Sequence, residues 1–312
     1  MERKRERLDI FSGHPSFPND VPTALLRLSL KDLLAEDETG IQRLGTACEE
    51  IARPRILEGA HMLFEIGASL FELPLEEKQK YDFSSQRSSQ DAAFYNVSRD
   101  HIMGMAQPLL APNILKKNHY VPNSFLKCSY SIVTLILDLL NAKLGLPEST
   151  LANIHRLQAV SGDQVRFVKA PPQPADDRRT ALGEYTDFGK VSVLFNRLGG
   201  LQVLPPGLDA EWQYVRPLPG HAIVNLGDAM VKLTNGLFRS NIHRVVSPPG
   251  EQADSTRYSL TYFSRPEDDV PLRRLGGSSR IPELGECEEE EAINSKDWTI
   301  PGTEILSRRL GA

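Results

Sequence analysis

Three short segments in the second half of the sequence carry residue types that could bind a metal ion and an acidic ligand. Tyr185 and Asp187 stand two residues apart, and His243 follows 56 residues after Asp187. Arg257 comes 14 residues after His243, with Ser259 two residues further on. Residues two apart on a β-strand face the same side. We therefore expect Tyr185 to point with Asp187, and Arg257 to point with Ser259.

The Asp187 carboxylate and the His243 imidazole would be ligands for a first-row transition metal if separate strands bring them together. Two histidines and one carboxylate, with open positions left over, form the facial triad typical of non-heme Fe(II) oxygenases. The Arg257 guanidinium, with the Ser259 hydroxyl beside it, would bind one end of a small dicarboxylate through charge-assisted hydrogen bonds. Taken alone, His243 could be a core histidine and Asp187 could bond a turn. The joint pattern favours the ligand interpretation.

The elements that must position these residues are short strands, which begin at about Gln164. Seven segments are rich in Val, Ile, Tyr and Phe: QVRFVKA, VSVLFN, LQVLP, WQYVRP, HAIVNL, NIHRVVS and RYSLTYF. Turns with Gly, Pro or Asp separate them, a spacing typical of a sandwich or barrel. We expect Gly199-Gly200 to form a tight hairpin turn between two of these strands.

The first half of the sequence is predicted to be helical. Residues 55–70 carry apolar side chains near a 3.6-residue period, and Pro74 is placed at the start of a further helix. The clearest helix covers 124–144, and we expect its stripe of Phe125, Ile132 and Leu139 to pack on the outer face of a sheet. The polar segment 84–92 is predicted to be a loop.

Helices first and strands later predict an α+β fold. We expect a double-stranded β-helix (jelly roll) core with flanking N-terminal helices. The predicted division has a helical N-terminal part at 1–158, the jelly-roll core at 159–270 and a C-terminal extension at 271–312. Four consecutive glutamates, Glu288 to Glu291, are interpreted as a solvated surface segment.

Composition excludes several classes of function. The 312 residues include 36 Lys+Arg and 41 Asp+Glu, and the net charge of -5 argues against a partner that is a nucleic acid. Three cysteines, Cys48, Cys128 and Cys287, are too few for a disulfide framework or a cysteine-based zinc site. No apolar stretch approaches the ~20 residues that cross a bilayer. We therefore expect a cytoplasmic protein without a membrane partner.

These motifs together resemble the Fe(II)/2-oxoglutarate-dependent dioxygenases of the isopenicillin N synthase-like type. That family has the motif order His-x-Asp, His, Arg-x-Ser. The flanking sequences are also similar: TDFG, GGLQV, VRPLPGHAIVNLGDAM, LTNGLFRSNIHRVV and RYSLTYFSRP. The first half adds ACEEI, FELPLEEKQKY and KLGLP. The resemblance covers about residues 20–270 and is greatest for fungal members that act in secondary metabolism.

The resemblance implies Fe(II) and 2-oxoglutarate as cofactors, with ascorbate as the reductant in an assay. Asp187 and His243 would hold the iron, and Arg257 with Ser259 would bind the distal carboxylate of 2-oxoglutarate. The implied reaction is hydroxylation or desaturation of a small organic substrate, such as a secondary metabolite. Candidate substrate-binding residues are Phe94, Tyr95, Asn96, Phe195 and Phe263.

Position 185 departs from the family pattern, because the sequence has GEYTDFG where GxHTDFG is expected. Tyr185 stands at the place of the first iron-ligand histidine, and a phenol with a pKa near 10 is a poor ligand for Fe(II). Three outcomes stay open: weak iron binding with some turnover, an inactive protein, or altered chemistry that uses Tyr185. Glu184 is a poor substitute because strand alternation points it away from Asp187.

Two further departures bear on function. The apolar strand that family members carry after the ACxxx helix is missing or replaced after Ile51, where the sequence continues with Arg53-Pro-Arg. The segment from Arg166 to Pro171 lacks the Asn and Tyr that touch the co-substrate in plant relatives. The alternative function is therefore a catalytically inactive relative that acts as a binding protein or partner subunit.

Overall fold

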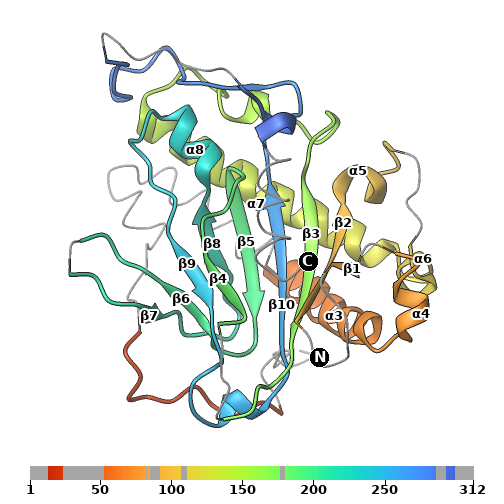
Figure 1. Cartoon of the computed structure of the whole chain (residues 1–312). Helices are drawn as coiled ribbons and strands as arrows, with labels where there is room; N and C mark the ends of the chain where they lie inside the picture. The colour runs from red at the N-terminus through yellow and green to blue at the C-terminus, as the bar shows by residue number, and fades with distance from the viewer. Residues whose placement is uncertain are drawn as a thin grey trace, which may run out of the picture.

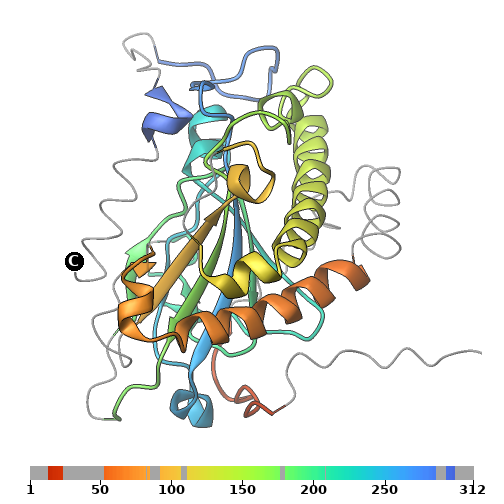
Figure 2. The same cartoon turned by 90° about the vertical axis from the view of Figure 1, so that its right-hand side faces the viewer.

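The computed structural model describes residues 13–23, 53–81, 83–84, 92–106, 111–175, 180–207, 209–285 and 293–298. Two antiparallel sheets face each other, and helices cover the outer face of the larger sheet (Figure 1). Figure 2 shows α3 (Arg53–Phe71) and α7 (Tyr120–Leu144) on that outer face. The predicted α+β class with a jelly-roll core and flanking helices is therefore confirmed.

The larger sheet has the strand order β1-β2-β3-β10-β5-β8. Its strands are β1 (Phe83–Ser84), β2 (Ala93–Ser98), β3 (Gln164–Ala170), β10 (Arg257–Ser264), β5 (Val191–Asn196) and β8 (Ile223–Leu226). The central strand β10 pairs with β3 through Thr261 opposite Arg166, and with β5 through Ser259 opposite Asn196. This register places the Arg257 end and the Phe263 end of β10 at opposite ends of the barrel.

The smaller sheet has the strand order β4-β9-β6-β7. Its strands are β4 (Leu182–Tyr185), β9 (His243–Val245), β6 (Leu201–Val203) and β7 (Gln213–Tyr214). Tyr185 lies opposite His243 in the β4–β9 pair, so two of the candidate site residues are direct cross-strand neighbours. A separate pair consists of β11 (Pro271–Leu272) and β12 (Ile293–Asn294).

All seven predicted strand segments contain a strand, but the predicted hairpin at Gly199-Gly200 is wrong. The strands on either side of it, β5 and β6, belong to different sheets, so this segment crosses from one sheet to the other. Gly200 has φ +98, and a Cβ atom there would lie 2.6 Å from the carbonyl oxygen of Val246. Only glycine fits such a backbone without strain.

Short helices connect the larger elements. They are α4 (Leu75–Lys78), α5 (Arg99–Ile102), α6 (Asn113–Lys117) and α8 (Asp228–Leu233), with 3-10 turns at Ala152–Ile154 and Gly250–Asp254. Helix α4 begins after Pro74, as predicted, because proline lacks the N–H that a first helical turn leaves unpaired. Helix α7 ends at Gly145, whose φ of 64 is the left-handed conformation common at helix ends.

The hydrophobic core lies between the larger sheet and helices α3 and α7. Phe125 of α7 is fully buried, and its ring centroid lies 5.6 Å from that of Phe195 on β5. Of the predicted stripe, Phe125 belongs to this core and Ile132 is partly buried against it, whereas Leu139 is buried outside it. Gly67 of α3 admits the ring of Phe167, since a Cβ there would lie 2.8 Å from that ring.

Helix α7 starts at Tyr120, four residues before the predicted start, and it is strongly apolar. Its 25 residues include a window with a mean hydropathy of 1.4, which by length and composition would also suit a membrane-spanning helix. Half of that window is buried against the rest of the molecule. Packing of this kind is what a core helix shows, and it explains the apolar composition.

Several predictions fall outside the described residues. These are the thiols Cys48 and Cys287, most of the loop at 84–92 and the glutamate run at 288–291. The segment after Ile51, where the sequence departs from the family's apolar strand, is described from Arg53 and forms helix α3. The division at 158 and 270 stays a prediction. Strands β1 and β2 precede residue 158, so the N-terminal part contributes two strands to the larger sheet as well as its helices.

Candidate metal and co-substrate site

The inner face of the larger sheet carries most of the polar candidate residues. Strand alternation sends Arg257, Ser259 and Phe263 of β10 to this face, while Leu260 and Tyr262 join the core under the helices. On β3 the same alternation turns Arg166 inward. Charged and polar groups from distant parts of the chain therefore meet between the two sheets.

Asp187 lies two residues beyond the end of β4 and is 8% exposed. Its Oδ2 atom accepts hydrogen bonds from the Ser192 hydroxyl at 2.5 Å and from the Asn225 amide at 2.9 Å. These two donors fix the carboxylate and leave Oδ1 facing His243, whose Nε2 atom lies 3.8 Å away. The predicted convergence of the two side chains within about 3–4 Å is therefore observed.

His243 begins β9 and is 8% exposed. Its Nδ1 atom lies 2.9 Å from the carbonyl oxygen of Asn241, so Nδ1 carries the proton and donates it. The Nε2 lone pair is then presented toward Asp187. A histidine fixed in this tautomer by a backbone carbonyl is the usual arrangement for a metal ligand.

Tyr185 lies beside His243 in the same region. Its ring centroid lies 4.1 Å from that of His243, at an interplanar angle of 59°. Burial raises the pKa of the Tyr185 phenol well above its usual value, the charge of Asp187 adds to this, and Arg166 and Arg257 oppose it. The phenol is thus protonated at neutral pH. Glu184 is turned to the surface, where it lies 3.9 Å from Arg244, as strand alternation predicted.

Arg257 is 2% exposed and is held by its neighbours. Its Nε atom donates to the carbonyl of Gly199 at 2.8 Å, and Nη1 donates to the Ser259 hydroxyl at 3.2 Å. Burial lowers the pKa of Arg257 to about 10, so the guanidinium stays charged at neutral pH. The predicted neighbourhood of Arg257 and Ser259 is present.

We expected the Arg257 guanidinium to point into the same cavity as the Asp187 and His243 side chains. It lines instead a pocket with Ala170 and Val246 and does not line the cavity beside Asp187, so this expectation is wrong. Arg257 starts β10 opposite Ala170, whereas Arg166 of the Asp187 cavity lies opposite Thr261. The charges of both Arg166 and Arg257 act on Tyr185.

The cavity beside Asp187 lies between β3, β10 and the segment after β4. Its lining consists of Gln164, Arg166, Tyr185, Thr186, Asp187, Phe188, Gly189, Phe263 and Arg265. Of the predicted substrate residues, Phe263 lines this cavity. Phe94 and Asn96 border it through Arg166, whose guanidinium lies 4.5 Å from the Phe94 ring and donates to Asn96 Oδ1 at 2.8 Å.

Tyr95 and Phe195 were expected at the substrate pocket and are not there. Both belong to the hydrophobic core on the helix side of the larger sheet. Tyr95 alternates with Phe94 and Asn96 on β2, and Phe195 packs against Phe125. Adjacent residues on a strand face opposite sides, so the three consecutive candidates 94–96 could not all have lined one pocket.

Sequence reasoning missed Ser192 and Asn225, the two groups that hold Asp187. Ser192 is a polar residue within the apolar run VSVLFN, and Asn225 plays the same part in HAIVNL. A polar residue in the inward register of a buried strand was the available signal. Gly227 was also missed: a Cβ there would lie 2.5 Å from the carbonyl oxygen of Asp187, so this glycine lets α8 approach the site.

The donor set partly fits a first-row metal. A carboxylate and an imidazole with facing atoms 3.8 Å apart suit one ion with ~2.1 Å bonds. Within the described ranges, no group of three His, Cys, Asp or Glu residues is placed to hold a metal ion. The site therefore offers one carboxylate and one imidazole, with the phenol of Tyr185 beside them.

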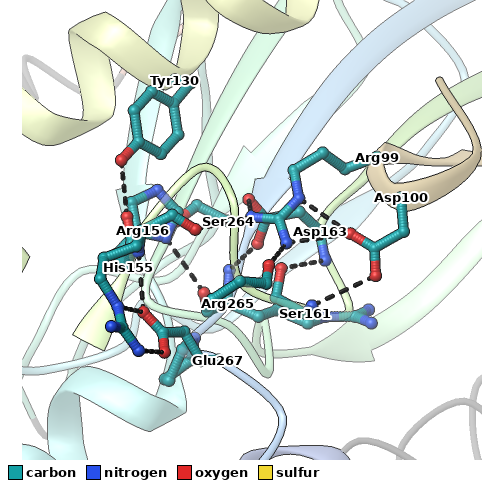
Figure 3. Close-up of polar contacts among 12 residues, drawn as sticks. Arg99, Asp100, Tyr130, His155, Arg156, Ser161, Asp163, Ser264, Arg265 and Glu267 are labelled. Atoms are coloured by element: carbon teal, nitrogen blue, oxygen red, sulfur yellow. Dashed lines mark hydrogen bonds and ion pairs between the residues drawn. The ribbon is translucent and has the colours of Figure 1, made fainter. Parts of the chain in front are cut away.

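A buried charge network lies next to this centre and holds Arg265 (Figure 3). Asp163 is fully buried and accepts hydrogen bonds from the Tyr262 hydroxyl at 2.6 Å and from the Arg265 backbone N–H at 2.7 Å. Arg99 lies 3.6 Å from Asp163 and pairs with Asp100 at 2.9 Å. Arg99 is thus paired with two acidic side chains of the network, which indicates a structural role.

Comparison with known proteins places these features in a family. The family model described as the 2OG-Fe(II) oxygenase superfamily matches residues 153–266. A 2-oxoglutarate-dependent dioxygenase of Amanita muscaria is 33% identical over 169 residues, which cover 53% of this chain and 81% of that protein. A second such dioxygenase, from Aspergillus fumigatus, is 27% identical over 333 aligned residues, covering 90% and 86%.

A solved structure has the same fold. A full-length protein of Neurospora crassa, crystallised in complex with alpha-KG, aligns with a TM-score of 0.70 at 20% identity. The alignment covers 88% of this chain and 94% of that protein. The likeness therefore extends over the N-terminal helices as well as the strands.

Proposed function

This chain belongs to the 2OG-Fe(II) oxygenase superfamily, a family of iron- and 2-oxoglutarate-dependent oxidoreductases, and we propose which residues carry that chemistry here. Asp187 and His243 hold the iron, while Arg257 and Ser259 bind the distal carboxylate of 2-oxoglutarate. When bound, iron and 2-oxoglutarate would use dioxygen as the oxidant: one oxygen atom would enter succinate as CO₂ is released, and the other would enter the hydroxylated substrate, or water when the substrate is desaturated.

One observation carries this assignment. The Asp187 carboxylate and the Nε2 atom of His243 face each other at 3.8 Å, in a buried position, with no Arg or Lys of the described residues within 4.0 Å of that carboxylate. A buried carboxylate without a paired cation is costly. A metal ion supplies the missing positive charge, and Ser192 and Asn225 keep the carboxylate aimed at it.

The residues of the chain have separate tasks in this proposal. Ser192 and Asn225 orient the Asp187 carboxylate, and the Asn241 carbonyl selects the His243 tautomer. The Arg257 fork has one nitrogen on the Gly199 carbonyl and one on Ser259, which leaves Nη2 for a ligand carboxylate. Buried, charge-assisted pairs of this kind are strong because water does not compete for them.

We further propose that Tyr185 replaces a histidine ligand and that the chain is of the isopenicillin N synthase-like type. The support is the motif GEYTDFG and the cross-strand pairing of Tyr185 with His243. The substrate is proposed to be a small organic molecule, such as a fungal secondary metabolite, and the location to be cytoplasmic.

The phenol at position 185 favours a second candidate function. A protein with two strong metal ligands instead of three would hold iron weakly and could act as a binding protein or partner subunit without turnover. The support for this candidate is the buried, protonated state of Tyr185. Asp187, His243, Arg257 and Ser259 favour the enzyme.

Succinate release by the purified chain separates the two candidates. The assay contains 2-oxoglutarate, Fe(II) and ascorbate, with Asp187→Ala as the matched control. Succinate formation that the control lacks supports the oxidoreductase. If the parent chain and the Asp187→Ala variant give the same background signal, the second candidate is supported.

A further inference from the structure

The cavity beside Asp187 contains hydrogen-bond donors that have no acceptor. Gln164 and Arg166 stand two residues apart on β3, and Arg265 directly follows β10. The Gln164 Nε2 and Arg265 Nε atoms are buried and have no hydrogen-bond partner among the described residues. Buried donors are nearly always paired in folded proteins, so two in one cavity indicate a missing acceptor.

The same cavity contains two arginine side chains that form no ion pair with a described residue, Arg166 and Arg265. Asp187 acts on both at longer range, and Asp163 and Asp268 also act on Arg265. Arg265 is only 9% exposed. The two guanidinium groups can therefore each accept an anionic partner at contact distance.

The surrounding structure holds both arginines in place. The Arg166 guanidinium lies between the rings of Phe94 and Phe263, at 4.5 Å and 5.0 Å from their centroids, and its Nε atom donates to Asn96. Its two Nη groups have no described acceptor. The Arg166 side chain is therefore held in position without a bound ligand.

Both the backbone N–H and the backbone carbonyl of Arg265 are hydrogen-bonded, which holds this residue in place (Figure 3). Its N–H donates to Asp163 at 2.7 Å, and its carbonyl lies 3.1 Å from His155 Nδ1. Its side chain rests on Gly162, where a Cβ would lie 2.7 Å from Nη1. A larger residue at 162 would displace the guanidinium.

We propose that Gln164, Arg166 and Arg265 form an anion subsite that binds a carboxylate group of the substrate. This proposal rests on the proposed function, because the subsite borders Asp187 and so places the substrate beside the metal. Guanidinium forks bind carboxylate and phosphate alike, and the negative charge of Asp187, which acts on both arginines, favours a singly charged carboxylate over a doubly charged phosphate. The substrate class is therefore a small organic acid.

The subsite is distinct from the co-substrate site at Arg257. Arg257 lies opposite Ala170, whereas Arg166 lies opposite Thr261, four residues further along β10. At about 3.3 Å per residue, these positions are separated by roughly 13 Å along the strand. One arginine can therefore hold 2-oxoglutarate while the pair at the other end holds the substrate.

Calorimetric titration of the full chain tests the subsite. The probes are benzoate, its neutral isostere benzamide and phenyl phosphate, in buffer with a chelator so that no metal binds the carboxylate. We expect benzoate to bind at least ~10-fold more tightly than benzamide, with phenyl phosphate no tighter than benzoate. Equal affinity for benzoate and benzamide overturns the subsite, and tighter phenyl phosphate binding overturns its assignment to a carboxylate. This comparison needs no variant.

Substitutions locate the binding. Arg166→Gln and Arg265→Gln are expected to weaken benzoate binding by about 10-fold each, while Arg166→Lys, which keeps the charge, weakens it less. Arg257→Gln should leave benzoate binding unchanged. Benzoate binding that depends on Arg257 and ignores Arg166 and Arg265 overturns the proposal.

A parallel titration with 2-oxoglutarate and Mn(II) tests the proposed function separately from the substrate subsite. Arg257→Gln should abolish 2-oxoglutarate binding, and Arg265→Gln should retain it. A parent chain that distinguishes benzoate from benzamide but binds no 2-oxoglutarate contradicts the proposed function and supports the subsite. A parent chain that binds 2-oxoglutarate without distinguishing the two probes contradicts the subsite alone.

Discussion

Two buried aspartates on the same barrel have different surroundings. Asp163 receives the Tyr262 hydroxyl, the Arg265 backbone N–H and the charge of Arg99. Asp187 receives two neutral donors and faces the His243 nitrogen at 3.8 Å, and no Arg or Lys of the described residues forms an ion pair with it. Asp163 is thus paired with a cation of the protein, whereas Asp187 has no such partner and can bind a metal ion.

Both carboxylates are buried, so burial does not tell a structural aspartate from a ligand-binding one. The presence or absence of an ion-paired arginine or lysine does. A buried charge paired with a protein cation holds two elements together and becomes costly when the pair is broken. A buried charge with oriented lone pairs and no protein cation is preorganised for a ligand. The first kind should therefore control stability, and the second should control binding.

The largest expected effect is on stability, at Asp163. Asp163→Asn should lower the free energy of unfolding by about 3–5 kcal/mol, because Arg99 loses one of its two buried acidic partners and the Tyr262 hydroxyl and Arg265 N–H lose a charged acceptor. The matched change Asp187→Asn should cost less than about 1 kcal/mol, since no cation loses a partner. Urea unfolding of both variants measures this, and equal losses would contradict the contrast between the two aspartates.

The second effect is a pH dependence of stability in the Asp163 network. Burial lowers the pKa of His155 to about 4, with Lys190 adding to this, from an ordinary value of 6.5. The unfolded chain therefore binds the extra proton first as pH falls, so stability is lost between about pH 6.5 and 4. The expected slope is about 1.4 kcal/mol per pH unit.

Urea unfolding at a series of pH values measures this slope, with His155→Gln as the control. Glutamine does not titrate and can still donate to the Arg265 carbonyl. The unfolding free energy of His155→Gln should therefore depend less steeply on pH, by about 1.4 kcal/mol per pH unit. Parallel slopes for the two chains would show that His155 does not cause the dependence.

The third effect concerns metal binding at the Asp187 centre. Tyr185→His should tighten Fe(II) binding by at least about 10–100-fold and start or raise 2-oxoglutarate turnover, because it adds a neutral nitrogen donor. The smaller ring should cost about 1–3 kcal/mol of stability. Anaerobic Fe(II) titration and succinate release measure the two outcomes.

Tyr185→Phe is the matched control, since it keeps the ring and adds no donor. It should bind Fe(II) no better than the parent chain. If Tyr185→His also fails to improve binding, position 185 is not the defect. If the parent chain already turns over as fast as Tyr185→His, the phenol is a competent part of the site.

The smallest expected effect comes from the residues that orient Asp187. Ser192→Ala removes the 2.5 Å hydrogen bond to Oδ2, so Mn(II) affinity should fall about 10-fold with a stability loss of about 1 kcal/mol. Ser131→Ala, on the exposed side of α7, is the control that should change neither quantity. Unchanged Mn(II) affinity in Ser192→Ala would mean that Asn225 orients the carboxylate alone.

Much of the fold could be predicted because its signals are local. The seven strand segments alternate or run apolar between Gly, Pro and Asp turns, and α7 has its own period and stop signal. The Gly199-Gly200 turn was misassigned because a glycine pair permits either a hairpin or a crossover. Strand pairing decides between them, and pairing is a long-range property.

The candidate site was predictable in part for the same reason. Motif spacing identified Asp187, His243, Arg257 and Ser259, while the substrate candidates at 94–96 mixed two faces of one strand. Gln164 and Arg265 gave no signal in the sequence. Their importance lies in donors left without acceptors, which depends on what surrounds them in space.

The sequence by itself determined the family resemblance, the strand series and the order of the candidate ligands, because these depend on residue types and intervals. The tertiary structure decided which groups neutralise each other. Asp163 and Asp187 look alike in the sequence, and only packing gives one an arginine and leaves the other facing an imidazole. Likewise, only the pairing of β3 with β10 brings Arg166 and Arg265 to one cavity, because electrostatic balance is set by distances in space.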